Sequence, residues 1–267
     1  MHIIQYYNMN FVVTGGNGYI GLHICYKLIF MSNVIIIDNL SNSNIKTIKK
    51  LQELSLKSKY ALTFYNSSLL NRDELSNIFH LHEPDAVIHL ASFKSVKESI
   101  ENPIEYYNNN ITGLLNLVYV MEKFDCYNLI FSSSATVYGD NSPPFLETDT
   151  IGNNITNPYG ETKVMCEKIL QDLCKSNYLW SVISLRYFNP IGAEPDGNFG
   201  ETINEYSSNL MPILLKVASN NNNICDYGEC YNKMQIFGKK YNTSNGTCER
   251  DFIHVEDLAD AHIKAIE

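Results

Sequence analysis

VTGGNGYIG, at residues 13–21, is the stretch of sequence that decides the fold of this chain. It follows a short apolar run and precedes a helical pattern, which predicts a strand, a tight turn and a helix. Gly15 can adopt backbone angles that other residues avoid, Gly18 leaves room for a pyrophosphate, and Gly21 lets helix and strand pack closely. The N–H groups at the start of such a helix bind phosphate. The stretch therefore predicts a nucleotide-binding turn.

A second strand ends in a carboxylate. Residues 34–38 read VIIID, a continuous apolar run typical of a buried parallel strand. Asp38 lies 20 positions after Gly18, where dinucleotide-binding folds place an acid on the adenosine ribose. A carboxylate there repels a 2′-phosphate and therefore favours NAD(H) over NADP(H). The alternative is that Asp38 only caps the turn at residues 39–43.

Composition excludes several classes of protein. The chain has 267 residues, 45% of them hydrophobic, which suffices for one α/β domain and a smaller lobe. A net charge of −9 argues against nucleic-acid and membrane surfaces. The seven cysteines are scattered like reduced cytosolic thiols, and the close pair Cys225 and Cys230 lacks the second pair that a zinc site needs. We therefore expect a cytoplasmic protein with no metal and no membrane span.

Strand-like and helical runs alternate along the chain, which predicts a Rossmann-type, doubly wound parallel sheet of the α/β class. Further strands are expected at residues 62–65, 86–90, 129–132 and 181–186, and helices at 71–80, 104–123 and 158–175. We place a dinucleotide-binding domain at residues 1–189. A smaller substrate lobe is expected at residues 190–267, with 235–267 returning in part to the main domain and a polar insertion at 225–233.

A tyrosine and a lysine stand four positions apart at the start of a predicted helix. Tyr159 and Lys163 would share one face of that helix, where an ammonium favours the phenolate and lowers the pKa of a general base. Ser134 follows the predicted strand at 129–132 and would lie where ligands bind a doubly wound sheet. Two alternatives stay open: a tyrosine packed on a surface lysine, and Ser132 and Ser133 satisfying their own turn.

At this point the chain resembles the extended short-chain dehydrogenase/reductase family, specifically its nucleotide-sugar epimerases, from about residue 9 to the end. The resemblance rests on long motifs in the order of the family, together with the stretch around Lys94. These motifs are TGGNGYIG (14–21), IIDNLSNS (36–43), PIEYYNNN (103–110), FSSSATVYGD (131–140), NPYGETK (157–163), LRYFNPIGA (185–193), SNLMP (208–212) and RDFIHVEDLADAH (250–262).

The resemblance implies roles for individual residues. Tyr159 would be the catalytic base, Lys163 its modulator and the anchor of the nicotinamide ribose, and Ser134 a hydrogen-bonding partner. The NAD site would be lined by Gly15, Gly18, Tyr19, Ile20, Gly21, Asp38, Asn39, Ser43, Lys94, Asn109 and Phe188. The UDP-sugar would be held by Asn189, Asn209 and Arg250. Without the resemblance, Arg250 and Asp251 suggest a surface ion pair, and Asn189 suggests a turn residue before Pro190.

The implied activity is the NAD-dependent interconversion of UDP-glucose and UDP-galactose. The sugar would be oxidised at C4, its 4-keto form would rotate, and the hydride would return to the other face. Ala135 and Thr136 stand where related dehydratases carry Asp-Glu, which argues against dehydration. A 4-epimerase of another UDP-sugar and a truncated or non-catalytic NAD-binding relative stay open. A homodimer is expected through the helices at 104–123 and 158–175.

Two departures from the family pattern stand out. Ser68 occupies the position of an aspartate that reaches the adenine amino group, so a charge-assisted hydrogen bond worth roughly 1.5–3 kcal/mol is expected to be lost or weakened. The chain also ends at Glu267, inside a helix expected to begin near Val255. Family members continue further, so we expect an incomplete lobe. The apolar face of this helix is expected to lack its usual cover; it comprises Leu258, Ala261, Ala265 and Ile266.

Overall fold

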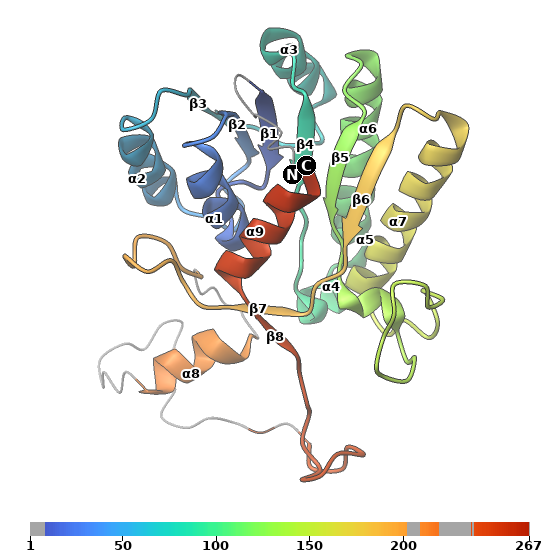
Figure 1. Ribbon diagram of the computed structural model, residues 1–267. Helices are drawn as coiled ribbons and strands as arrows, with labels where there is room; N and C mark the ends of the chain where they lie inside the picture. The colour runs from blue at the N-terminus through green and yellow to red at the C-terminus, as the bar shows by residue number, and fades with distance from the viewer. Residues whose placement is uncertain (1–8, 202–208, 219–235, 237, 267) are drawn as a thin grey trace, which may run out of the picture.

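The computed structural model describes residues 9–201, 209–218, 236 and 238–266 (Figure 1). Its centre is a six-stranded parallel sheet in the order β3-β2-β1-β4-β5-β6. The strands are β1 (Asn10–Thr14), β2 (Asn33–Asp38), β3 (Leu62–Asn66), β4 (Ala86–His89), β5 (Asn128–Ser132) and β6 (Ser181–Leu185). The order reverses direction beside β1, which opens a crevice at the carboxyl ends of β1 and β4. The predicted doubly wound α/β class is confirmed.

Helices cover both faces of the sheet (Figure 1). On one face lie α1 (Tyr19–Leu28), α2 (Ile45–Ser55) and α9 (Val255–Ile266). On the other lie α3 (Arg72–His82), α6 (Gly113–Lys123) and α7 (Pro158–Ser176). Neighbouring strand residues serve opposite cores, since Val13 and Ile36 pack towards α1 whereas Val12 and Ile35 pack towards α6. The continuous apolar run of β2 is therefore buried from both sides.

The predicted helix at 104–123 is built from three segments. Pro103–Tyr107 forms α5, Asn108–Thr112 forms the π-helical turn η1, and Gly113–Lys123 forms α6. The preceding helix, α4 (Val96–Glu101), begins at the side-chain cap of Ser95. A π-helical turn inserts an extra residue into the helical repeat and often marks a functional site. Periodicity alone did not reveal this turn.

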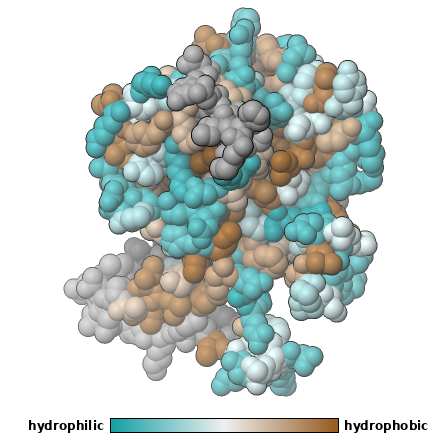
Figure 2. Space-filling view, viewed as in Figure 1, coloured by the Kyte–Doolittle hydropathy of each residue, from teal (hydrophilic) through white to brown (hydrophobic). Residues whose placement is uncertain are grey.

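A smaller group of elements lies at the carboxyl end of the sheet (Figure 1). It contains the parallel pair β7 (Asn189–Ile191) and β8 (Phe252–His254), and the helix α8 (Leu210–Ala218). Hydrophobic residues gather over α8 on the viewed face (Figure 2), where Leu215 is 62% exposed. The insertion at 225–233, with Cys225 and Cys230, lies outside the described residues.

The expectation of an uncovered last helix is wrong. Helix α9 packs along α1 and against β5, and Leu258 is only 1% exposed. Ala265 and Ile266 pack against the same core as the strands. Lys27 of α1 fixes this arrangement by ion pairs to Glu256 and Asp260. The main sheet therefore covers the apolar face that the sequence left without a partner.

No helix within the described ranges has the length and apolar character needed to cross a membrane. Within the same ranges, His, Cys, Asp and Glu side chains form no group of three or more that could hold a metal ion.

Two buried histidines make the fold sensitive to acid. Burial lowers the pKa of His262 to about 4 and that of His89 to about 3, from a usual value near 6.5. Between pH 6.5 and 4 the unfolded chain therefore binds protons that the folded chain does not bind. Unfolding free energy is expected to fall across this window, on the order of 3 kcal/mol for His262 alone. Urea unfolding at pH 7 and pH 5 measures the loss.

The variant His262→Leu is expected to show a smaller loss between the two pH values than the unchanged chain. His80→Leu provides the control substitution, because it replaces an imidazole that is exposed on α3 and lies outside the core. Equal pH dependence in the unchanged chain and in His262→Leu would contradict the assignment.

Candidate active site

The glycine turn joins β1 to α1 at the switch point of the sheet. Gly15 has a φ of +67°, and a Cβ atom there would lie 2.7 Å from the Ala91 nitrogen. A Cβ atom on Gly21 would lie 2.5 Å from the Gly15 oxygen, so helix and turn touch through backbone. A Cβ atom on Gly18 would lie 3.2 Å from the Gly15 oxygen, with no other close neighbour. As the N-cap residue of α1, Gly18 provides no side-chain hydrogen bond to the helix. The first turn of α1 thus presents its N–H groups and contains no acidic residue.

Asp38 organises the loop that follows β2. Its Oδ1 accepts hydrogen bonds from the Leu40 N–H at 2.9 Å and the Ser43 hydroxyl at 3.0 Å. Its Oδ2 accepts from the Asn17 N–H at 3.0 Å, which ties the carboxylate to the glycine turn. Asn39 caps its own turn by accepting from the Ser41 N–H. Asp38 is therefore a turn cap, and its bond to Asn17 also places it beside the glycine turn.

A buried hydroxyl at the end of β3 lacks a partner. The Ser67 Oγ is buried and has no hydrogen-bond partner within the described residues, while the Ser67 N–H donates to the backbone carbonyl of Asp38 at 3.3 Å. Ser68, in contrast, accepts from the Leu70 N–H at 3.2 Å. An orphaned polar atom beside Asp38 fits a bound nucleotide, because buried polar groups are normally paired. Sequence reasoning passed over Ser67, and only its burial reveals it.

Ser134, Tyr159 and Lys163 come together at the carboxyl end of β5. Asn157 caps α7 through the Gly160 N–H at 2.9 Å, and this fixes the first turn of the helix that carries Tyr159. The Ser134 side chain lies near enough to the Tyr159 hydroxyl to lower its pKa, and the Ser134 Oγ accepts from the Thr136 N–H at 3.2 Å. The Lys163 Nζ lies 5.9 Å from the centre of the Tyr159 ring and donates to the Ser132 carbonyl at 2.7 Å. The structure thus gathers the three residues that the sequence singled out.

The electrostatics of this group differ from expectation in one respect. Burial raises the pKa of Tyr159, and the neighbouring Ser134 side chain only partly offsets this rise. The expected lowering by Lys163 is not among the causes of this shift; its ammonium instead donates to the Ser132 carbonyl. Burial also lowers the pKa of Lys163 to about 8, against the opposing effects of Cys166 and Glu167. Within the chain alone, therefore, Tyr159 is held as the neutral phenol.

The π-helical turn η1 supplies a buried asparagine that sequence reasoning missed. Asn110 accepts from the Phe93 N–H at 2.8 Å and donates to the Thr162 hydroxyl of α7 at 2.9 Å. The predicted cofactor residue Asn109 donates to the Asn110 side chain at 2.9 Å. Asn110 thus connects the loop after β4 to the helix that carries Tyr159. The run of three asparagines at 108–110 was the available signal.

Two predicted ligands meet at an acidic residue that was not singled out. The Lys94 Nζ lies 3.1 Å from Glu201 Oε1, and the Asn209 side chain donates to the same oxygen at 2.6 Å. Glu201 therefore links a predicted cofactor residue to a predicted substrate residue. Tyr19, at the start of α1, donates its hydroxyl hydrogen to the Gly192 carbonyl at 2.6 Å.

The remaining predicted residues lie beyond the end of β6. Asn189 pairs with Phe252 in the β7–β8 ladder, and its side chain donates to the Asp251 carbonyl at 2.9 Å. Arg250 is exposed and donates to the Glu249 carbonyl. Phe188 is 38% exposed and faces the ring of Phe145 at a centroid distance of 6.1 Å.

The fold and this site define an enzyme class: a Rossmann-type, nucleotide-dependent protein with the serine, tyrosine and lysine of short-chain dehydrogenases/reductases. Residues 11–267 match the NAD dependent epimerase/dehydratase family, and the chain belongs to that family. The resemblance seen in the sequence is thereby confirmed.

Relatives of known function and structure agree. The chain is 44% identical over 261 residues to the UDP-glucose 4-epimerase of Bacillus subtilis, covering 97% of the chain and 73% of that protein. It is 44% identical over 257 residues to that of Dictyostelium discoideum, covering 96% and 71%. The crystal structure of UDP-glucose 4-epimerase from Bifidobacterium longum, in complex with NAD+ and UDP, superposes with a TM-score of 0.87 at 36% identity, covering 97% and 74%.

Proposed function

We propose that this chain catalyses the NAD-dependent interconversion of UDP-glucose and UDP-galactose. The observation that carries the proposal is the convergence of Ser134, Tyr159 and Lys163 beside a glycine turn with an uncapped helix. Relatives named UDP-glucose 4-epimerase, at 41–44% identity over nearly the whole chain, support the choice of substrate. No metal is required by the proposal.

The chain fits NAD through particular residues. The backbone of Gly15, Gly18 and the first turn of α1 would hold the diphosphate, and Asp38 the adenosine ribose. The unpaired Ser67 hydroxyl would face the adenine end. The other proposed cofactor contacts are Tyr19, Ile20, Gly21, Asn39, Ser43, Lys94, Asn109 and Phe188. When bound, NAD would supply the hydride acceptor for C4 and, in its oxidised form, a positive charge near Tyr159.

The chain's own groups handle the proton. Tyr159 would accept the proton of the sugar 4-hydroxyl as its phenolate and return it to the same oxygen after the sugar has turned. Ser134 would hydrogen-bond that oxygen, and Lys163 would hold the nicotinamide ribose. Asn189, Asn209 and Arg250 would bind the nucleotide sugar, with the Arg250 guanidinium suited to a diphosphate. Because Tyr159 is neutral in the chain alone, proton transfer would depend on a loaded site.

The function is tested by incubating the purified chain with UDP-galactose, with and without added NAD, and measuring the UDP-glucose formed. Conversion in both reactions is expected if NAD is retained during purification. Conversion only with added NAD would indicate weak retention, with Ser68 as the first residue to restore to Asp. NAD binding without conversion would overturn the proposal in favour of a non-catalytic relative. Parallel reactions with other UDP-sugars identify the preferred substrate.

We further propose that the chain forms a homodimer through α5, α6 and α7. These helices carry exposed hydrophobic side chains. Their exposed fractions are 79% for Ile104, 45% for Leu115, 54% for Tyr119 and 41% for Met165. Burying such a surface is favourable by about 25 cal/mol for each Å² of apolar area. The molar mass of the purified chain in light scattering tests this, and a monomer across micromolar concentrations would contradict it.

Two further predictions stay as proposals. Residues 1–189 would form the NAD-binding domain and 190–267 the substrate lobe, with 235–267 returning in part; the contact of α9 with α1 and β5 supports that return. A cytoplasmic location is supported by the free thiols of Cys25, Cys126, Cys166, Cys174 and Cys248. Limited proteolysis would test the division into two domains, and cell fractionation would test the cytoplasmic location.

A further inference from the structure

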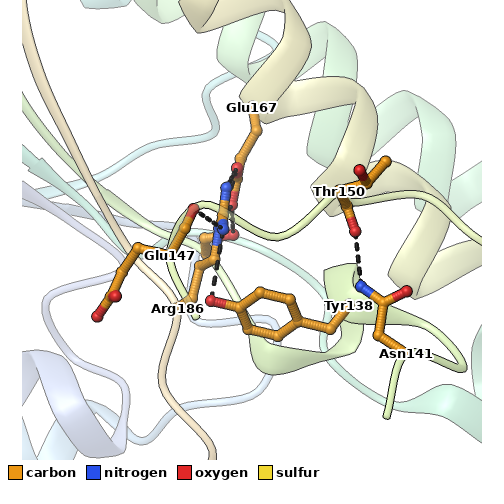
Figure 3. Close-up of polar contacts among 7 residues, drawn as sticks. Tyr138, Asn141, Glu147, Thr150, Glu167 and Arg186 are labelled. Atoms are coloured by element: carbon orange, nitrogen blue, oxygen red, sulfur yellow. Dashed lines mark hydrogen bonds and ion pairs between the residues drawn. The ribbon is translucent and has the colours of Figure 1, made fainter. Parts of the chain in front are cut away.

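A buried ion pair lies beside the proposed catalytic residues without belonging to them. Glu167, on α7, has a side chain only 2% exposed, and Arg186 follows directly after β6. The Arg186 Nε donates to Glu167 Oε1 at 2.9 Å, and its Nη2 donates to Oε2 at 2.7 Å (Figure 3). Such a forked contact fixes orientation as well as charge, which a single-point contact does not. Breaking it would leave a buried charge without its partner.

The acidic side of the pair reaches the catalytic group through two segments. Glu167 stands one helical turn after Lys163 and two turns after Tyr159, on the same face of α7. The Ser133 hydroxyl donates to Glu167 Oε1, and Ser133 directly precedes Ser134. The carboxylate therefore ties α7, which carries Tyr159, to the strand end that carries Ser134.

The basic side of the pair reaches a loop and an aromatic stack. The Arg186 Nη1 donates to the Glu147 carbonyl at 3.1 Å, and the guanidinium lies 5.2 Å from the centre of the Tyr138 ring (Figure 3). Tyr138 stacks on Phe145 at 4.9 Å, and Phe145 stacks on Phe188 at 6.1 Å. The stack thus leads from the ion pair to Phe188, the proposed cofactor contact.

We propose that Glu167 and Arg186 are positioning residues, which hold Ser134, Tyr159 and Phe188 in the geometry that the reaction requires. The inference rests on the proposed function, because it assigns these neighbours their roles. Neither residue touches the reacting atoms; each acts through the segments it joins. Displacing a reacting group by about 1 Å can cost roughly 100-fold in rate. The pair is therefore expected to affect turnover more than substrate affinity.

The test compares Arg186→Lys and Glu167→Gln with the unchanged chain for kcat, KM, retained NAD and thermal midpoint. Arg186→Lys keeps the charge but loses the forked contact with Glu167 and the Nη1 contact with the Tyr138 hydroxyl. In both variants kcat is expected to fall about 10- to 100-fold, with KM and NAD content nearly unchanged. The double variant should lose about as much as one single variant, because the two residues act as a unit.

Asp172→Asn provides the matched control on the same helix. Asp172 forms exposed ion pairs with Lys168 and Lys175, so its loss should leave kcat unchanged. If the Arg186→Lys and Glu167→Gln variants showed a lower thermal midpoint but an unchanged kcat, the positioning role would be overturned. The pair would then serve the stability of the fold alone.

Tyr159→Phe, measured in parallel, separates the two proposals. If Tyr159→Phe is inactive while the pair variants match the unchanged chain, only the positioning role fails. If the unchanged chain converts no UDP-sugar, the proposed function fails and the positioning role fails with it.

Discussion

Replacing Tyr159 with Phe is expected to reduce turnover of UDP-galactose by about 10²- to 10⁴-fold, the usual contribution of a positioned acid–base group. The change removes one hydroxyl, which lies near Ser134, and keeps the ring beside Lys163. Substrate binding and NAD content should change little, because neither depends on proton transfer. The measurement is kcat and KM with UDP-galactose, together with the absorbance of the cofactor released on denaturation.

Tyr178→Phe is the matched control, since Tyr178 is 92% exposed at the end of α7 and should tolerate the same change. Turnover in Tyr159→Phe within a few-fold of the unchanged chain would remove Tyr159 from the mechanism. Loss of NAD together with turnover would indicate a disturbed site instead of a missing base, and the assignment would then fail for a different reason.

Gly15→Ala is expected to have the second largest effect, because it should lower both the stability of the fold and the binding of the cofactor. A Cβ atom at Gly15 would lie 2.7 Å from the Ala91 nitrogen and 2.8 Å from its Cα, and the backbone has a φ of +67°. Backbone must move to admit it, at a cost of about 1–3 kcal/mol for overpacking and about 1 kcal/mol more for strain. Retained NAD is expected to fall sharply, and urea unfolding measures the loss of stability.

Two other glycines make the interpretation specific. Gly200 has no heavy atom within 4 Å of a built Cβ, so Gly200→Ala should change neither stability nor NAD content. At Gly18 a built Cβ meets only the Gly15 oxygen, at 3.2 Å. Gly18→Ala is therefore expected to lower NAD content more than stability. If Gly15→Ala retained full NAD content and stability, the result would contradict the inference that close packing of the glycine turn against the loop after β4 is required for either property.

The sequence by itself determined the main architecture and the centre of the site. Apolar runs such as 34–38 make buried parallel strands because they have no polar face to turn to water. The spacing of Tyr159 and Lys163 on one helix is local, so helical geometry alone places them together. The same holds for the glycine turn, whose conformational demands are set by its own residues. Local patterns of this kind can be read without knowing the rest of the fold.

Only the tertiary structure decided what depends on contacts between distant segments. No sequence pattern indicated that α9 would pack on α1 and β5, or that Glu201 would contact both Lys94 and Asn209. The raised pKa of Tyr159 likewise depends on burial by the whole fold, which outweighs the opposing effect of Ser134. Glu167 and Arg186 are 19 positions apart and meet only because β6 lies beside β5, under α7. Such pairings are set by the packing of the sheet, and residue spacing does not encode them.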